Sequence, residues 1–116
     1  MFEPKNILVP TDFSEYSDNA LAHAIDIASK FNSKIYLLHV MEDLHQCVAD
    51  YCLSDAVIEE INVQSQKATT DKLTKEVKAI GESKGVDIDF DIQTGVAYET
   101  ILREQQTKGI DLIVIA

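Results

Sequence analysis

Short apolar runs alternate with longer amphipathic stretches along this sequence, and that alternation restricts the fold more than any other feature. Four runs have the length and composition of β-strands, at residues 6–10, 34–40, 86–93 and 111–116. The last, DLIVIA, is apolar without interruption from Leu112 onward, as in a parallel strand that is covered on both faces. Such a strand needs a neighbour on each side. We therefore expect that a longer natural chain, or a partner chain, provides the strand that this sequence lacks.

The stretches between these runs carry the signals of helices. Ser14 is a suitable N-cap for a helix over residues 15–31, which has apolar residues at spacings of three and four. A long polar helix is predicted over about 54–84, with Gly85 as its C-terminal stop, and a third helix over 98–108. The order of elements is therefore β-α-β-α-β-α-β.

The run at 86–93 differs from the other three, because its apolar residues alternate with Asp87, Asp89 and Asp91. This pattern is typical of an edge strand with one face in water. Strands that alternate with helices imply a parallel sheet with right-handed crossovers. The predicted fold class is α/β, an open Rossmann-like parallel sheet with helices on both faces and strand order 3-2-1-4, in one domain over residues 1–116.

Composition excludes several classes of function. Twenty acidic residues against ten Lys and Arg leave a net charge of −10, which argues against binding of nucleic acid, since phosphate contacts need clustered basic side chains. No apolar run approaches the roughly 20 residues of a membrane span. The start, MFEPKNILVPTD, lacks the pattern of a signal peptide. We expect a cytoplasmic protein that binds neither nucleic acid nor a membrane.

Two groups of residues resemble metal ligands. His45, Cys47 and Cys52 could supply three ligands, but zinc sites usually contain a tighter pair of cysteines. Reversible thiol chemistry is an alternative, and ordinary reduced cysteines are the favoured interpretation. The alternating aspartates of 86–93 resemble the start of an EF-hand loop, yet the Gly and Glu that such a loop requires further on are absent. No metal site is predicted.

The predicted strand order places a crevice at the carboxyl ends of the first and fourth strands, where open α/β sheets bind ligands. Thr11 and Asp12 follow the first strand, and their hydroxyl and carboxylate could bond a sugar or a polar ring edge. The alternative is that both only hold the loop and the start of the next helix. No G-x-G-x-x-G motif follows this strand, which argues against a dinucleotide-binding dehydrogenase. His39 is interpreted as a structural histidine, with a catalytic role as the alternative.

Four segments, in this order and at this spacing, resemble the universal stress protein family. They are NILVPTDFSEYSDNAL near the start, KIYLLHV as the second strand, the turn at Gly95 with the helix after it, and DLIVIA. The resemblance covers the whole chain. It implies a five-stranded sheet of order 3-2-1-4-5, whose last helix and fifth strand are not present in this sequence. Because the fifth strand commonly pairs two subunits in this family, the resemblance also implies a homodimer.

Many members of the family bind ATP or AMP, so the resemblance implies one of these ligands, with Mg²⁺ accompanying ATP. In the family, the loop after the first strand lies near the ribose or adenine, the end of the second strand lies against the adenine, and a segment Gly-x2-Gly-x9-Gly-Ser/Thr after the fourth strand holds the phosphates. This sequence ends at or just before the first Gly of that segment. The site residues implied here are Pro10, Thr11, Asp12, Val40, Ile115 and Ala116.

Three functions are compatible with the sequence. The first is a stress-response module that binds an adenine nucleotide, and the second is a module that acts through dimerisation and protein contacts alone. The third, a slow ATP hydrolase, is least favoured, because beyond Asp12 the sequence offers no group to orient a water and no carboxylate cluster for a metal. We predict the first function, with the second as its alternative, and no catalytic residue.

Overall fold

The computed structural model describes residues 3–41 and 54–115, and its strands form one parallel sheet. In chain order the elements are β1 (Asn6–Pro10), α1 (Glu15–Phe31), β2 (Lys34–Met41), α3 (Asp55–Lys84), β3 (Asp87–Thr94), α4 (Ala97–Thr107) and β4 (Leu112–Ile113). The strand order is β3-β2-β1-β4, and every pairing is parallel. The α/β fold class and the order 3-2-1-4 predicted from the sequence are confirmed.

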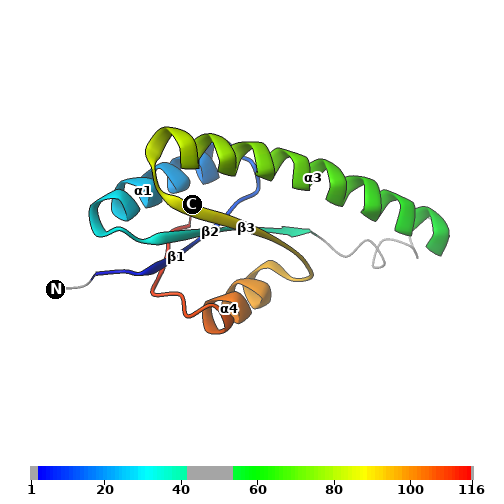
Figure 1. Ribbon diagram of the computed structural model, residues 1–116. Helices are drawn as coiled ribbons and strands as arrows, with labels where there is room; N and C mark the ends of the chain where they lie inside the picture. Colours follow the sequence, from blue (N-terminus) through cyan, green and yellow to red (C-terminus); the bar gives the residue numbers. More distant parts are fainter. Residues whose placement is uncertain (1–2, 42–53, 116) are drawn as a thin grey trace.

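Helices cover both faces of the sheet, with α1 and α3 above it and α4 below it in the view of Figure 1. Side chains alternate between the two faces along each strand. The larger core lies on the side of α1 and α3, and its buried residues include Ile7, Val9, Leu21, Ala24, Ile35, Leu37 and Leu73. The smaller core lies on the side of α4 and contains Leu8, Leu38 and Ile110.

Both ends of α1 follow the local signals of the sequence. The Ser14 side chain accepts a hydrogen bond from the N–H of Ser17 at 3.2 Å, as an N-cap should. At the other end Asn32 has φ 57°, in the left-handed region that Asn tolerates better than most residues, and its N–H donates to the carbonyl of Ala28. The predicted boundaries of this helix are confirmed.

The helix α3 is longer than the sheet that it covers. It has 30 residues, and its C-terminal half packs on the sheet through Leu73, Val77 and Ile80. Its N-terminal half extends past the carboxyl ends of the strands (Figure 1), and Val57 and Val63 are exposed there. The apolar stripe predicted for this helix therefore meets the sheet over only part of its length.

The carboxyl of Glu76, on α3, is destabilised in its charged form. Burial raises the pKa of Glu76 above its ordinary value, the charge of Asp18 on α1 raises it further, and Lys72 partly opposes both. A raised pKa in the folded state stabilises the fold at low pH, and this contribution is lost as the pH rises through that pKa.

Replacement of this carboxyl, Glu76→Gln, is therefore expected to raise the free energy of unfolding by about 0.5 kcal/mol at neutral pH. Near pH 3 the carboxyl is protonated in both states, so the gain is expected to vanish. Denaturant unfolding at the two pH values measures the difference. An equal gain in the free energy of unfolding at both pH values would show that the charge of Glu76 is not the cause.

The strand β3 lies at the edge of the sheet as predicted, but only part of its polar face is in water. Asp87 and Asp89 are exposed, whereas Asp91 lies 3.2 Å from Nζ of Lys108, which also pairs with Glu104. Burial would raise the pKa of Asp91, but its hydrogen bonds and the charge of Lys108 outweigh burial and lower it. The prediction of a wet face is wrong for Asp91, because the end of α4 brings Lys108 over this part of the strand.

The fourth strand is shorter and less buried than the sequence predicted. The expectation was a fully buried strand over 111–116, but β4 contains only Leu112–Ile113, and both residues are half-buried. Its exposure has a simple cause, since β1 is its one neighbour within the described part of the chain. Ala116 lies outside the described residues.

Pro10 accounts for the short pairing of β4 with β1. Alternate residues of β1 bond to β4, as the 3.0 Å hydrogen bond from the N–H of Val114 to the carbonyl of Leu8 shows. The next residue of β1 on that side is Pro10, which has no N–H to donate. The ladder between β1 and β4 therefore ends where the sheet reaches its carboxyl edge.

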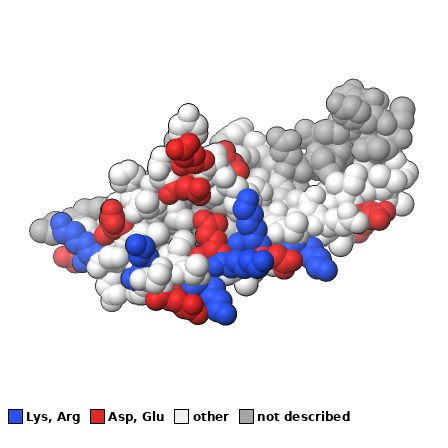
Figure 2. Space-filling model, turned by 90° about the horizontal axis from the view of Figure 1, so that it is seen from above, with Lys and Arg blue, Asp and Glu red and all other residues white. Residues whose placement is uncertain are grey.

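Acidic and basic side chains are interspersed on the face that carries α1 and α3 (Figure 2). Neither charge gathers there into one continuous patch. No helix in the described ranges is long and apolar enough to cross a membrane.

Candidate functional site

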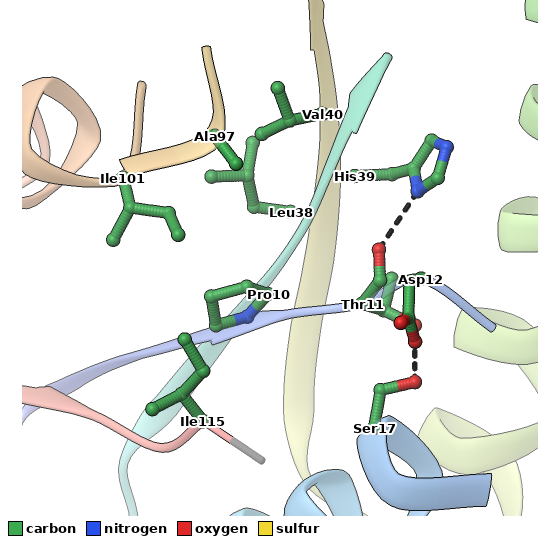
Figure 3. A pocket seen from close by; sticks show the side chains of 10 residues that line it. All are labelled: Pro10, Thr11, Asp12, Ser17, Leu38, His39, Val40, Ala97, Ile101 and Ile115. Carbon is green, nitrogen blue, oxygen red and sulfur yellow. Dashed lines mark hydrogen bonds between the residues drawn. The ribbon is translucent and has the colours of Figure 1, made fainter. Parts of the chain in front are cut away.

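A pocket of about 280 Å³ opens at the carboxyl ends of β1 and β2, beside the first turns of α4 (Figure 3). This is the edge at which open parallel sheets bind ligands. Its lining residues are Pro10, Thr11, Asp12, Ser17, Leu38, His39, Val40, Ala97, Ile101 and Ile115. In Figure 3 the apolar side chains of Leu38, Val40, Ala97 and Ile101 lie on one side of the pocket, and the polar side chains of His39, Thr11, Asp12 and Ser17 lie on the other.

The structure brings the residues suggested by the sequence together. Five of the six line this one pocket, namely Pro10, Thr11, Asp12, Val40 and Ile115, and Ala116 is not among the described residues. Sequence reasoning did not assign Ser17, Leu38, Ala97 or Ile101 to the site, and it interpreted His39 as structural. A signal for Leu38 was available, because it shares a face of β2 with Val40.

The loop after β1 is held by its own side chains. Oγ1 of Thr11 accepts from the N–H of Phe13 at 3.1 Å and lies 3.2 Å from Oγ of Ser17. Oδ1 of Asp12 accepts from the N–H of Ser14 at 3.0 Å. Thr11 and Asp12 therefore do stabilise the loop and the start of α1, as the structural alternative expected.

Asp12 is a fixed negative charge at the mouth of the pocket. Its side chain is exposed, and hydrogen bonds from the hydroxyl and the N–H of Ser14 lower its pKa below the ordinary value. The carboxylate is therefore ionised at neutral pH and can only accept hydrogen bonds. Such a group suits a ligand that offers hydroxyl donors.

The backbone ladder between β1 and β2 defines which groups face the pocket. The N–H of Thr11 donates to the carbonyl of Leu38 at 2.8 Å, so Leu38 faces β1. The carbonyl of Met41 accepts from the N–H of Gly95 at 3.0 Å, so Met41 faces the side of β3. Backbone direction alternates along a parallel strand, and Val40 therefore faces the same side as Leu38.

The next rung of this ladder would join Val40 to Thr11 and Phe13, but both of these partners bond elsewhere. The carbonyl of Thr11 accepts from Nδ1 of His39 at 2.8 Å, and the N–H of Phe13 donates to Oγ1 of Thr11. Within the described ranges no hydrogen bond joins the backbone of Val40 to this loop. Within the described ranges the N–H and the C=O of Val40 are therefore left out of this ladder, on the side of β2 that faces β1.

The described ranges contain no group of three His, Cys, Asp or Glu side chains placed to hold a metal ion. The candidate ligands His45, Cys47 and Cys52 lie outside those ranges. The structure therefore does not test whether they bind a metal, undergo reversible thiol chemistry or are ordinary reduced cysteines.

The pocket lies in a fold and a sequence that known proteins share. A profile of the universal stress protein family matches residues 3–116. The chain belongs to the universal stress protein family. Universal stress protein MJ0531 from Methanocaldococcus jannaschii is 32% identical over 111 residues, which cover 96% of this chain and 63% of that protein. This chain therefore spans less than two thirds of the length of that relative.

Solved universal stress proteins have the same fold. The universal stress protein UspA from Lactobacillus plantarum is 24% identical, with a TM-score of 0.79 over 99% of this chain and 78% of that one. A universal stress protein family protein from Arabidopsis thaliana, solved with AMP bound, is 21% identical, with a TM-score of 0.66 over 97% of this chain and 76% of that one. At these identities the two structures establish the fold alone.

Proposed function

We propose that the pocket binds an adenine nucleotide, ATP or AMP, and that this universal stress protein is of the nucleotide-binding kind. The observation that carries the proposal concerns Val40, which lines the pocket and whose N–H and C=O are not paired with the loop after β1 within the described residues. Pro10, Thr11, Asp12, Val40 and Ile115 are its proposed contacts. Ala116 is proposed as the last contact before a phosphate-binding segment. Mg²⁺ would accompany ATP through the phosphates.

Val40 offers a donor and an acceptor side by side, and this pair matches the edge of adenine. Adenine presents an acceptor, N1, next to a donor, the 6-amino group. Guanine presents the reverse, a donor at N1 next to an acceptor at O6. A backbone N–H and C=O in fixed positions therefore bond adenine and leave guanine unmatched, which selects against guanine.

The walls of the pocket fit the rest of a nucleoside. Apolar side chains of α4 and β2 form one side of the pocket, so a flat ring can lie against the half-buried side chains of Val40 and Ile101. Asp12, ionised at the mouth, is placed to accept the hydroxyl protons of a ribose. The AMP-bound relative from Arabidopsis thaliana supports the proposal as a member of the same family.

The alternative is a universal stress protein that acts through a homodimer and protein contacts without a nucleotide. Two exposed apolar side chains favour it, since Ile115 after β4 is 62% exposed and Leu102 on α4 is 56% exposed. In either case the protein is proposed to be cytoplasmic, with residues 1–116 belonging to one domain.

Calorimetric titration of the full-length protein with AMP, ATP and GMP tests the proposal. We expect AMP and ATP to bind and GMP to bind at least about tenfold more weakly. Absence of binding by both adenine nucleotides would favour the contact-only alternative. Equal affinity for GMP would contradict the role of Val40.

The substitution Asp12→Asn is expected to weaken AMP binding by about tenfold, because an ionised acceptor is replaced by a neutral amide. The matched control is Asp26→Asn, which removes an exposed carboxylate from α1 at a residue that does not line the pocket. Titration of both variants with AMP gives the comparison. A similar loss in both would point to net charge rather than to a contact with the ribose.

A further inference from the structure

We propose that His39 is a positioning residue for this pocket. By bonding to the carbonyl of Thr11, His39 ends the hydrogen-bond ladder between β1 and β2 before Val40, and so keeps the backbone of Val40 from pairing with the loop after β1. The bond from Nδ1 of His39 to the carbonyl of Thr11 takes the acceptor that the N–H of Val40 would otherwise use. That a ligand uses the backbone groups of Val40 rests on the proposed function. The effect of His39 on the ladder between β1 and β2 is independent of that function.

The carbonyl of Thr11 has a choice of two donors. Thr11 is only 8% exposed, and a buried carbonyl is almost always hydrogen-bonded. Continuation of the ladder would give it the N–H of Val40, and the structure instead gives it His39 at 2.8 Å. Because a carbonyl only accepts, Nδ1 of His39 must carry a proton, which leaves Nε2 without one in the neutral ring.

The imidazole is held by aromatic packing. The ring centroids of Phe13 and His39 lie 4.8 Å apart. Lys72, on α3, places its Nζ 4.1 Å from the centroid of the Phe13 ring. Phe13 itself has φ 63°, a left-handed conformation that is uncommon for a large side chain. In this conformation the N–H of Phe13 donates to Oγ1 of Thr11 rather than to the carbonyl of Val40.

Removal of the imidazole should allow Val40 to pair with the loop after β1. In His39→Leu the carbonyl of Thr11 loses its donor, and the N–H of Val40 is the group that continuation of the ladder would bring to it. The loop would then pair with β2, and the adenine edge would lose its donor. His39→Asn is the conservative variant, because its side-chain amide can place an N–H near the position of Nδ1.

The first measurement is amide hydrogen exchange of Val40 by NMR in the full-length protein without ligand. We expect fast exchange in the unmodified protein and in His39→Asn, and at least about tenfold slower exchange in His39→Leu. Titration with AMP should show a loss of about tenfold to a hundredfold in affinity for His39→Leu alone. His23→Leu, the same substitution at an exposed histidine of α1, is the control and should change neither quantity.

Two results would overturn the proposal: a Val40 amide already protected in the unmodified protein, or one that exchanges equally fast in His39→Leu. If the exchange data agree but no adenine nucleotide binds, the proposed function fails while the role of His39 in the ladder is upheld. Should His39→Leu not fold, nitrogen chemical shifts of the unmodified protein decide. The proton of the neutral ring is expected on Nδ1, and its location on Nε2 would overturn the proposal.

Discussion

Truncation of Leu37 to alanine is expected to lower the free energy of unfolding by about 2–5 kcal/mol. Leu37 has no exposed surface and lies in β2, one of the two central strands, within the core that includes Ile35, Val9 and Leu73. The substitution removes buried apolar surface and leaves a cavity between the sheet and the helices above it. Domains of this kind have only about 5–15 kcal/mol in total, so much of the stability would be lost.

Urea unfolding followed by circular dichroism measures this loss. The matched control is Leu102→Ala, the same change on α4 at a side chain that is 56% exposed, where we expect less than about 0.5 kcal/mol. If the two substitutions cost the same, the packing described for the core would be wrong.

The second large effect is expected in binding. Ala97→Phe places an aromatic ring in the first turn of α4, where Ala97 lines the pocket together with Val40 (Figure 3). The ring would occupy the space in which the adenine is proposed to lie. We expect AMP affinity to fall by about a hundredfold or more, because the remaining volume cannot hold both rings.

The stability of this variant should change little, since Ala97 is exposed and the new ring enters a space that holds no side chain. Ala22→Phe makes the same replacement at an exposed alanine of α1 that does not line the pocket, and it should leave AMP affinity unchanged. Normal AMP binding by Ala97→Phe would place the nucleotide elsewhere.

Much of the fold could be predicted because the pattern of apolar and polar residues in a strand depends on which of its faces are buried. Alternating aspartates placed β3 at an edge, and continuous apolar runs placed β1 and β2 at the centre. The length of β4 could not be predicted from its own sequence, DLIVIA. It depends on a missing N–H at Pro10, which belongs to the neighbouring strand.

The candidate site was predictable to a similar extent. Thr11, Asp12 and Val40 follow from strand ends and from the family resemblance, and the structure places all three around one pocket. The contribution of His39 could not be deduced, because it depends on which of two donors reaches the carbonyl of Thr11. The left-handed conformation of Phe13 accompanies this bond, and no sequence pattern specifies that conformation.

The uneven anchoring of α3 has a consequence for motion. Its C-terminal half packs on the core through Leu73, so we expect those turns to resist local opening most strongly. The turns nearer Ser54 project beyond the carboxyl ends of the strands (Figure 1), where Val57 and Val63 are exposed although Ile58 is buried. One helix thus joins a half that packs on the core to a half that projects beyond the sheet, and its amide hydrogens are expected to exchange most slowly around Leu73.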